Sequence, residues 1–543
     1  MFSRNGSLIH SALLVFLGIN LSIISTISFA AQKNTPITKT TSTADHSKFE
    51  ELKKIFKTGP EVTKACISCH TEASKQLHKT KHWNWQFTNP DNGEVVGKKT
   101  VVNNFCLSIT SNLPRCTSCH IGYGWKDDSF DFTAQDKVDC LVCHDTTDTY
   151  KKFPTDAGHP NYKEKAFPKG SKKIWKVADL SNVARKVGKT RRENCGVCHF
   201  YGGGGDGVKH GDLDSSMTNP DKNLDVHMGV DGLNFGCSEC HTTDGHDVKG
   251  SRYNPVAKDT HGIDVPGRDD NSRATCESCH GVTPHESTLN NKINDHTDKV
   301  ACVTCHLPTY ARGGVPSKMW WDWTTAGKKD ADGKHIKMKN EKGYVTYVTK
   351  KGNFEWAENV EPEYAWLSGD VRYKQLDEVI NPDEVVELNT FAGSYDDPDA
   401  RIWPFKVMRG KQPYDKGNNT LVLLHLFGKD KAAYWKSYDW DSAISAAMKE
   451  GGAEYSGEYG FIETSMHMPL AHMVPPKDQT LGCSDCHSKD GRLANLTDFY
   501  MPGRDNNKIL DTIGWLAIAG TLGGVGLHGL VRVLFARKRR MKL

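Results

Sequence analysis

Long apolar runs occur only near the two ends of the 543-residue chain. The first, at about 13–29, follows Arg4 and ends at the small residues Ala30 and Ala31. A basic start, an apolar stretch and a small-residue end are typical of a cleavable Sec signal peptide, here 1–31. Because the apolar run is on the long side, an uncleaved N-terminal anchor is the alternative.

The second apolar run covers 513–535, where only His528 and Arg532 are strongly polar. Its length suffices for one membrane crossing, so the sequence predicts a transmembrane helix over 510–536. The basic tail 537–543 belongs on the cytoplasmic side. We therefore expect a single-pass anchor that leaves the bulk of the chain on the periplasmic face of the inner membrane. An amphipathic helix lying on the membrane surface is the alternative.

Between these runs the chain is polar, and few regular elements are predicted. An alternating run at 344–356, interrupted by Lys351 and Gly352, is typical of a β-hairpin. Helical patterns occur at about 428–450 and 482–498. With 37% apolar residues and a mean hydropathy of −0.58, aliphatic burial alone is a weak way to hold this chain together.

Cysteine and histidine are the unusual components, with 17 and 24 residues respectively. The pattern C-x-x-C-H occurs eight times and uses sixteen of the cysteines. Two thiols three residues apart lie near one side of a helical turn and can add to the two vinyl groups of a haem, while the adjacent histidine binds the iron. The predicted attachment residues are Cys66, Cys69, Cys116, Cys119, Cys140, Cys143, Cys195, Cys198, Cys237, Cys240, Cys276, Cys279, Cys302, Cys305, Cys483 and Cys486. The predicted iron ligands are His70, His120, His144, His199, His241, His280, His306 and His487.

Two other uses of so many cysteines are less consistent with this pattern. A disulfide framework gives no reason for histidine to follow every second cysteine. A zinc array needs paired C-x-x-C units or two further histidines at finger spacing, whereas each unit here is complete alone. The sequence therefore predicts eight covalently bound haem c groups. A net charge of +4 does not indicate a nucleic-acid partner.

The spacing of the motifs predicts the domain organisation. Seven motifs start 24 to 55 residues apart, which is too irregular for a solenoid, and 176 residues without a motif then precede the eighth. We expect a mainly α and irregular multihaem cytochrome c fold, with little β-structure, wrapped around eight stacked haems. The predicted order after the signal peptide is a polar tether at 32–47, a seven-haem core at 48–306, a haem-free insertion with some β-structure at 307–482 and an eighth-haem segment at 483–505.

Electron-transfer haems commonly take a second histidine on the far face of the iron. Four of the sixteen histidines outside the motifs are set aside because they lie in the signal, the tether, a Lys/Gly-rich loop and the membrane segment: His10, His46, His335 and His528. Twelve remain for eight positions, and any of them could instead be a surface or hydrogen-bonding residue. The strongest candidates are His82, His210, His227, His285, His296, His467 and His472. The last two stand in a Met-rich run, so methionine ligation is an alternative there.

The seventeenth cysteine, Cys106, belongs to no motif and lies ten residues before Cys116. An exported protein is thus left with an odd thiol, close to the second haem. As a thiolate it could attack a sulfur–sulfur bond or be oxidised. The neighbouring amides of Asn103 and Asn104 could orient a small oxyanion. The alternative is an inert buried cysteine or one that bridges to another chain.

The motifs resemble those of the octahaem tetrathionate reductase family over roughly residues 60–500. The resemblance rests on the eight motifs in this spacing, with Asn-Asn-Phe-Cys at 103–106 ahead of the second and Val-Gly-Lys-Thr at 187–190 ahead of the fourth. His-Phe-Tyr-Gly-Gly-Gly-Gly-Asp follows at 199–206. It implies seven haems with two histidine ligands each and a catalytic second haem whose distal ligand is lysine, with a cysteine in the same pocket.

Carried onto this chain, the resemblance assigns Cys106 and Asn103 to the pocket and the lysine ligand to Lys189, with Lys186 and Lys209 as alternatives. Without the resemblance, Lys189 would be a solvated charge in a basic run. A lysine must be neutral to bind iron, so a desolvated site must lower its pKa.

The predicted function is a membrane-anchored octahaem reductase for a small oxidised sulfur or nitrogen compound, supplied by a membrane or periplasmic electron donor. It would convert tetrathionate to thiosulfate, or nitrite or hydroxylamine to ammonia. Cys106 would act on sulfur, Lys189 would gate the iron and Asn103 would position the anion. The alternatives are a pure electron conduit, hydroxylamine oxidation and, least consistent with eight cofactors, a structural role. This chain differs from the soluble members of the family by its C-terminal anchor. The difference bears on which electron donor serves the protein and not on the reaction at the catalytic haem.

Overall fold

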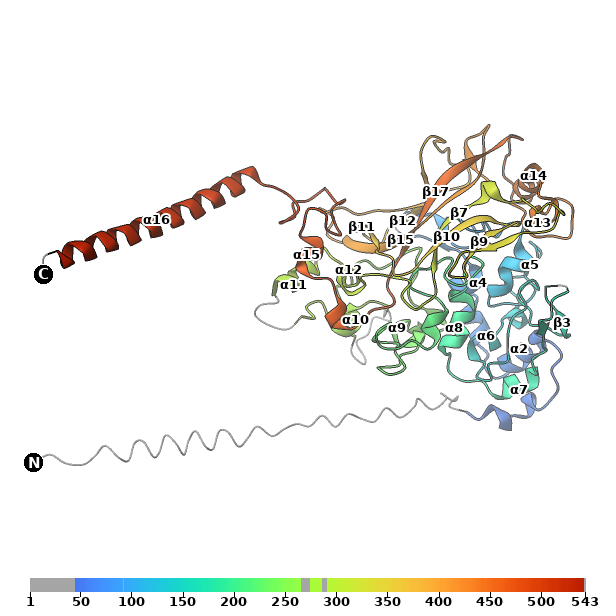
Figure 1. The fold of residues 1–543 in the computed structure, drawn as a ribbon. Helices are drawn as coiled ribbons and strands as arrows, with labels where there is room; N and C mark the ends of the chain where they lie inside the picture. The colour runs from blue at the N-terminus through green and yellow to red at the C-terminus, as the bar shows by residue number, and fades with distance from the viewer. Residues whose placement is uncertain (1–43, 91, 169, 265–273, 286–290, 542–543) are drawn as a thin grey trace, which may run out of the picture. The chain divides into compact units, whose positions relative to one another are not determined.

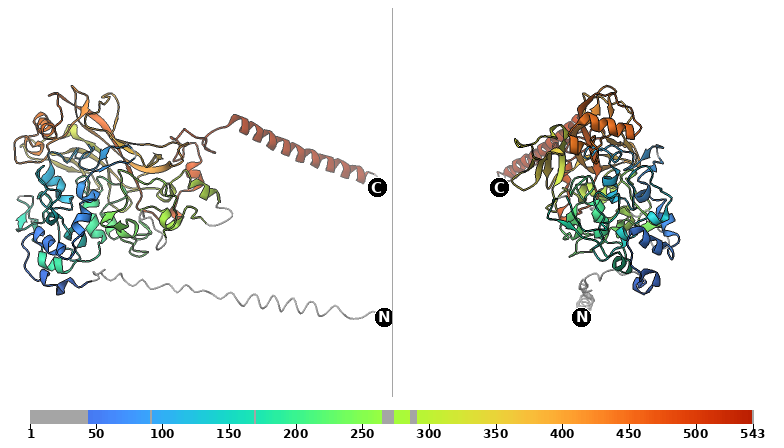
Figure 2. Two further views of the ribbon diagram at one scale, coloured as in Figure 1. Left: turned by 180° about the vertical axis from the view of Figure 1, so that it is seen from behind. Right: turned by 90° about the vertical axis from the view of Figure 1, so that its right-hand side faces the viewer.

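Motif-bearing loops and a β-sheet form the two main parts of the protein. The computed structural model describes residues 44–541 except 91, 169, 265–273 and 286–290, so the predicted signal peptide and most of the tether lie outside the described residues. All described residues belong to the unit Thr41–Leu543. The blue-to-green segments that carry seven motifs lie along one side of the yellow-to-orange sheet in each view (Figures 1 and 2).

The helices that carry motifs are short, most of them a single turn, which places both cysteines on one side. They are α2 (Gly59–Ile67), α5 (Leu113–Cys116), α6 (Leu141–His144), α8 (Arg192–His199), α9 (Cys237–Cys240), α10 (Glu277–His280), α12 (Cys302–His306) and α15 (Cys483–Cys486). Other short helices are α3 (Ala73–Leu77), α4 (Lys81–Asn84), α7 (Leu180–Arg185) and α11 (Asn291–His296). The 3-10 turns are η1 (His46–Lys48), η2 (Glu50–Leu52), η3 (Thr117–Cys119), η4 (Gln135–Lys137), η5 (Ser215–Thr218), η6 (Trp323–Thr325) and η7 (Lys477–Gln479).

The stretch between the seventh and eighth motifs forms most of the β-structure. Its described part has a nine-stranded sheet of order β13-β17-β15-β7-β10-β9-β8, with β11 and β16 also paired to β15. The strands are β7 (Ser317–Asp322), β8 (Lys337–Lys339), β9 (Val345–Val348), β10 (Gly352–Ala357), β11 (Glu363–Leu367), β13 (Val386–Glu387), β15 (Arg401–Asp415), β16 (Thr420–Leu421) and β17 (Tyr459–Pro469). β15 runs antiparallel to β17 and parallel to β7. The chain therefore has more β-structure than the sequence predicted.

Four further strand pairs lie outside this sheet, and each is a short two-stranded element. They are β1 with β2 (Phe87–Thr88, Val95–Val96), β3 with β4 (Lys165–Ala166, Ile174–Trp175), β5 with β6 (Thr243–Asp244, Asp247–Val248) and β12 with β14 (Val371–Tyr373, Asn389–Phe391).

Three of the predicted elements can be compared directly with the structure. The hairpin is confirmed, because β9 and β10 are antiparallel and Gly352 pairs with Val348. The helical pattern at 428–450 forms two helices, α13 (Tyr434–Ser437) and α14 (Trp440–Glu450), whereas that at 482–498 forms only the single turn α15.

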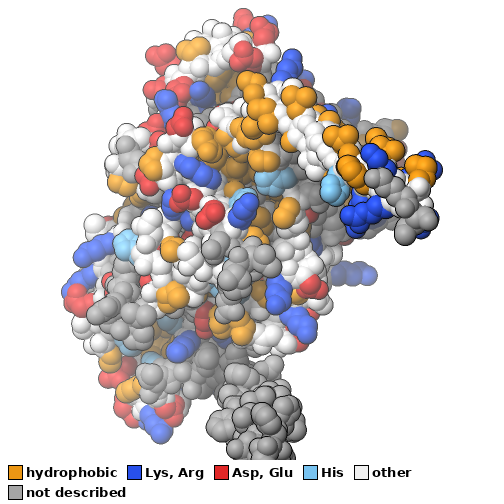
Figure 3. Space-filling model, turned by 90° about the vertical axis from the view of Figure 1, so that its left-hand side faces the viewer, with side chains coloured by type: hydrophobic (Ala, Val, Ile, Leu, Met, Phe, Trp, Pro, Cys, Tyr) orange, Lys and Arg blue, Asp and Glu red, His pale blue; other side chains and the backbone are white. Residues whose placement is uncertain are grey.

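The predicted membrane segment forms one helix, α16 (Lys508–Arg540). It is long and apolar enough to cross a membrane, by length and composition. None of its residues is buried against the rest of the protein. Figure 3 shows apolar side chains along it, with basic residues gathered at its end.

The sheet packs directly on the loop that carries Cys106. Phe105 and Leu107 share an apolar core with Trp321 of β7 and Met408 of β15. The side-chain amide of Asn104 donates a hydrogen bond to the carbonyl oxygen of Met408 at 2.6 Å. The motif-free insertion therefore helps to fix the position of the odd thiol.

A buried ion pair joins the start of β15 to the sixth motif. Arg401 contacts Glu277 of α10, and their side chains are only 3% and 7% exposed. The next residue, Ile402, accepts a 2.7 Å hydrogen bond through its carbonyl oxygen from the hydroxyl of Thr304 in the seventh motif. The first two residues of β15 thus contact the helices of both the sixth and the seventh motif, α10 and α12.

Replacement of Arg401 by methionine should destabilise the fold strongly. It leaves the Glu277 carboxylate buried and unpaired, which costs about 3–5 kcal/mol. The matched control is Arg409→Met on the same strand, because the Arg409–Glu363 pair is about half exposed. The control should lose no more than about 1 kcal/mol. Urea unfolding of the haem-loaded protein measures both losses, and equal losses would contradict the assignment.

Candidate functional site

Six motif histidines each face a histidine from elsewhere in the chain. The centroids of the paired rings are 6.0–6.3 Å apart. Two imidazoles that bind one metal from opposite sides, at about 2 Å each, have their ring centres at about this separation. The pairs are His70 with His46, His199 with His82, His241 with His472, His280 with His227, His306 with His285 and His487 with His296.

The histidine of the third motif, His144, has a neighbour of the same kind. His246 is close enough for its charge to interact with those of His144 and His70. The side chain of Gln76 lies 2.8 Å from Nδ1 of His246 and holds the ring. Seven motifs therefore have residues that fit an iron with two histidine ligands.

Backbone carbonyls fix the orientation of several motif histidines. The Nδ1 atom of His144 donates to the carbonyl oxygen of Gly188 at 2.8 Å, and that of His241 donates to Lys249 at 2.9 Å. Such a bond fixes the tautomer and leaves Nε2 free to bind a metal.

The structure brings five of the predicted distal histidines opposite a motif histidine, namely His82, His227, His285, His296 and His472. His467 instead packs its ring against Phe391 and Phe405. His210 is also outside these ring pairs, and burial next to Lys209 lowers its pKa well below the usual range.

Sequence reasoning set aside His46, which faces a motif, and kept His246 among the twelve remaining histidines without ranking it with the strongest candidates. His46 was assigned to a tether, but it begins the turn η1, where the Asp45 side chain accepts a hydrogen bond from the backbone of Ser47. The Asp-x-Ser pattern is a capping signal that could have located this turn. His246 follows Gly245 in the β5–β6 turn and has a positive φ of 67°.

The second motif differs from the other seven. The ring of His120 is fully buried and packs against Trp83, Trp85, Trp125 and Phe130, with ring centroids 4.9–5.7 Å away. Its Nε2 atom lies 2.7 Å from the carbonyl oxygen of Trp83. Burial lowers the pKa of His120 to about 3, so the ring is neutral. No described histidine faces it, whereas each of the other seven motif histidines has one nearby.

Asn103 folds the loop that presents Cys106. Its side-chain oxygen accepts a 3.0 Å hydrogen bond from the backbone N–H of Cys106, and its side-chain N–H₂ donates to the carbonyl oxygen of Leu107 at 2.6 Å. Leu107 has a φ of 63°, a strained conformation of the kind found at functional sites. The amide of Asn103 is therefore engaged in positioning Cys106, whereas the sequence prediction was that it positions the anion.

The three candidate lysines lie in different surroundings. Lys189 and Lys186 are exposed, and the residue before Lys189 is bonded to the third motif. Lys209 packs on Gly202 and Gly203, and the carbonyl oxygen of Gly203 lies 3.5 Å from the Sγ atom of Cys106. Burial, followed by the nearby Arg252 and Lys98, lowers the pKa of Lys209 well below its usual range. Of the three, the structure places Lys209 with Cys106.

Comparisons with known proteins agree with the histidine geometry. A family model described as "Cytochrome c bacterial" matches residues 318–490, within the motif-poor part of the chain. The crystal structure of an octaheme cytochrome c from Shewanella oneidensis is 43% identical, covers 83% of this chain and 96% of its own, and superposes with a TM-score of 0.71. The chain belongs to the multihaem c-type cytochromes. An uncharacterized protein from Archaeoglobus fulgidus is 24% identical and covers 41% of this cytochrome and 86% of its own length.

Contacts between thiols show which motifs of the cytochrome are neighbours. Four pairs of cysteines from different motifs lie close together, namely Cys66 with Cys140, Cys119 with Cys198, Cys195 with Cys237 and Cys276 with Cys302. Cys143 also lies near Cys195, Cys240 near Cys279 and Cys305 near Cys486. The motifs therefore form a continuous series that runs from the eighth through the seventh, sixth and fifth to the fourth. At the fourth motif the series divides. One branch leads to the second motif, and the other leads through the third motif to the first.

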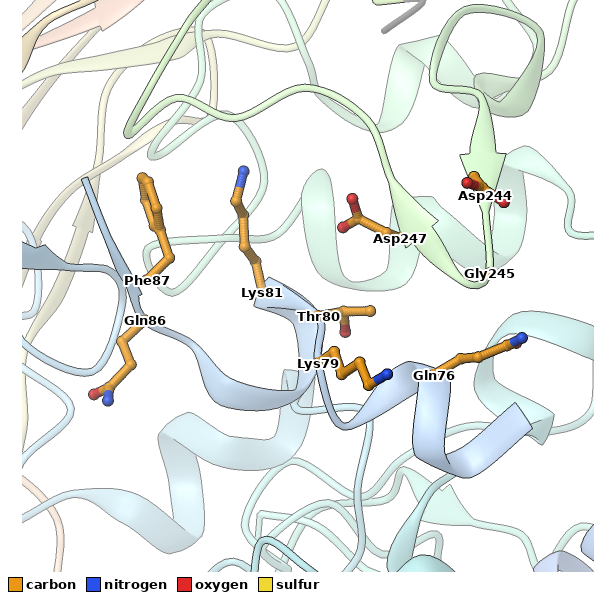
Figure 4. Close-up of a pocket in the computed structure, with 9 residues that line it drawn as sticks. All are labelled: Gln76, Lys79, Thr80, Lys81, Gln86, Phe87, Asp244, Gly245 and Asp247. Carbon is orange, nitrogen blue, oxygen red and sulfur yellow. The ribbon is translucent and has the colours of Figure 1, made fainter. Parts of the chain in front are cut away.

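A pocket of about 470 Å³ is lined by residues that flank His82 and His246 in the sequence (Figure 4). It is lined by Gln76, Lys79, Thr80, Lys81, Gln86, Phe87, Asp244, Gly245 and Asp247. The ammonium group of Lys81 lies 4.8 Å from the centre of the Phe87 ring. The pocket is thus at the edge of the third and fourth motifs and shares no residue with the Cys106 loop.

Replacement of His246 by methionine should change one haem of the loaded cytochrome. A histidine–methionine ligand set has a higher reduction potential than one with two histidines. Near-infrared magnetic circular dichroism and a redox titration should show one altered haem. The control His467→Met should leave the spectrum and the reduction potentials of all haems unchanged. If His467→Met alters one haem and His246→Met alters none, His467 rather than His246 is the iron ligand.

Proposed function

We propose that this cytochrome is a membrane-anchored octahaem reductase that acts on a small oxidised sulfur or nitrogen compound. The reactions are tetrathionate to thiosulfate, and nitrite or hydroxylamine to ammonia. The observation that carries the proposal is the second motif, whose histidine has no histidine opposite it among the described residues. When bound, the haems would supply single electrons and, at this motif, an iron that a substrate can approach.

Lys209, rather than Lys189, is the lysine that we assign to this site. A lysine binds a metal only as a neutral amine, and burial favours the neutral form. Lys209 is half-buried and close to Cys119 of the second motif, whereas Lys189 is exposed. No described carboxylate forms an ion pair with Lys209, which leaves its amine available.

Cys106 performs the sulfur chemistry in this proposal. Its thiolate attacks one central sulfur of tetrathionate, forms a Cys–S–S bond and releases one thiosulfate as the central S–S bond breaks. Two electrons from the donor partner then break the new bond, release the second thiosulfate and restore the thiolate. The two steps together consume two electrons and no proton. Asn103 holds the backbone of Cys106 in place.

The donor partner is a membrane or periplasmic redox protein that docks at the eighth motif. This motif ends the series of neighbouring motifs, and its histidine, His487, lies 21 residues before the first residue of α16. Cys483 is exposed, and His487 is half-buried. We propose Sec-dependent export and anchoring by α16 at the periplasmic face of the inner membrane, which keeps this end of the series near a membrane donor.

A pure electron conduit is the second candidate function. The continuous series of motifs favours it, because closely spaced cofactors suit transfer along the chain. The odd thiol with the half-buried Lys209 beside it has no role in a conduit. A conduit also predicts no spectral response to nitrite or hydroxylamine.

Replacement of Cys106 by serine should abolish most tetrathionate reduction. Removal of a nucleophile lowers kcat/KM by roughly 10³-fold or more. Reduction of hydroxylamine, which has no sulfur–sulfur bond, should fall much less. Steady-state assays with a reduced dye as donor measure both rates, and full retention of tetrathionate reduction would rule out the role of the thiol.

A further inference from the structure

Two lysines of the β-sheet lie beside Cys106 without a partner of opposite charge. Lys318 of β7 is 3% exposed, and its Nζ atom lies 3.3 Å from the ring centre of Phe354 and 4.1 Å from that of Trp321. Lys351 stands in the β9–β10 turn. Neither ammonium group has a hydrogen bond or an ion pair among the described residues.

Gly204 brings Lys351 and Cys106 together. The Sγ atom of Cys106 and the Nζ atom of Lys351 lie 3.3 Å and 3.7 Å from the point where a Cβ atom of Gly204 would stand. Gly204 has a φ of +96°, which favours glycine. The absence of a side chain here leaves a space that the thiol and the ammonium group both border.

The sheet fixes both lysines relative to each other. Phe354 of β10 pairs with Trp321 of β7, and the Trp321 indole N–H donates a 2.7 Å hydrogen bond to the carbonyl oxygen of Lys351. The charges of Lys318 and Lys351 interact with each other and with Cys106. The two ammonium groups thus lie 4.1 Å and 5.4 Å from the centre of one ring, that of Trp321.

A buried ammonium group, that of Lys318, and a half-buried one, that of Lys351, are costly without a counter-charge. A desolvated charge is stable in a protein only when it is paired or hydrogen-bonded. Because the described residues supply no carboxylate to either lysine, a bound anion is the counter-charge that would keep both ammonium groups protonated. Oxyanions suit lysine, which binds them as a compact point charge with three donors.

We propose that Lys318 and Lys351 form an oxyanion clamp that holds a sulfur oxyanion with its sulfur–sulfur bond against Cys106. This inference rests on the proposed function and narrows its substrate class to a dianion such as tetrathionate, in preference to neutral hydroxylamine. A carboxylate of a haem propionate has the same recognition chemistry. The test below therefore separates a free anion from a propionate.

The first measurement is binding of tetrathionate to the oxidised, haem-loaded protein by isothermal titration calorimetry. Without an electron donor, binding is measured apart from reduction. Loss of a charge-assisted hydrogen bond weakens binding by about 10- to 150-fold. We expect Lys318→Met and Lys351→Met each to raise the Kd for tetrathionate by at least about tenfold. Lys351→Arg keeps the charge and should retain binding within about threefold of the unmodified protein.

Lys350→Met is the matched control, because it removes the same charge from the neighbouring position in the chain. Its Kd should equal that of the unmodified protein. Haem content and the absorption spectrum of each variant show whether it has folded and loaded. If either variant fails to load, Lys318→Arg and Lys351→Arg provide the comparison, and retained binding in both supports the clamp.

The second measurement is the KM of each variant for tetrathionate and for hydroxylamine. The clamp predicts a rise for tetrathionate at least about fivefold greater than for hydroxylamine. Equal changes for both substrates, or an unchanged Kd for tetrathionate, would overturn it. A shifted potential of one haem with unchanged tetrathionate binding would assign the lysines to a propionate. If the unmodified protein binds tetrathionate but reduces none of the substrates, the proposed function fails while the clamp stands.

Discussion

The structure depends on holding each of several large apolar cofactors between two side chains from different parts of the chain. Paired imidazoles about 6 Å apart join segments that are distant in sequence, such as His82 with His199 and His241 with His472. Each pair closes a long loop through a metal, which is a stronger constraint than any contact in so polar a chain. The short helices and irregular loops follow, because ligand positions rather than helix packing set the path of the chain.

The second motif has no such histidine pair among the described residues. Ordinary side-chain packing, including that of the β-sheet on the Cys106 loop, holds this part of the chain instead. His120 is packed among aromatic rings, so its part of the chain gains stability from ordinary burial. The sheet covers the Cys106 loop through Phe105 and Leu107. In the proposed function, the reactive site therefore lies where the pairing of histidines stops and a conventional apolar core begins.

Features encoded by a few adjacent residues could be predicted from the sequence. The attachment motifs, the β9–β10 hairpin and the helix α16 are of this kind, because spacing, alternation and length each report a local structure. β15 could not be predicted in this way. It is buried on both faces, so its residues do not alternate, and it contains Pro404 and Pro413, which argue against a strand.

Ligand partners required the folded structure. His46 stood in a polar segment that resembled a tether, and His246 had no distinguishing neighbours in sequence. Lys189 fitted the motif by position, yet Lys209 is the half-buried lysine next to Cys106, because the glycine-rich loop folds back on itself. Contacts between distant segments of the chain decide which of several similar side chains is removed from water.

Electron paramagnetic resonance of the fully oxidised, haem-loaded cytochrome, combined with near-infrared magnetic circular dichroism, tests the central claim most directly. The account predicts seven haems with two histidine ligands and one with a different ligand set, which Lys209→Met alters and Lys189→Met does not. Eight haems with two histidine ligands each, or a distinct haem that responds to Lys189→Met alone, would contradict it.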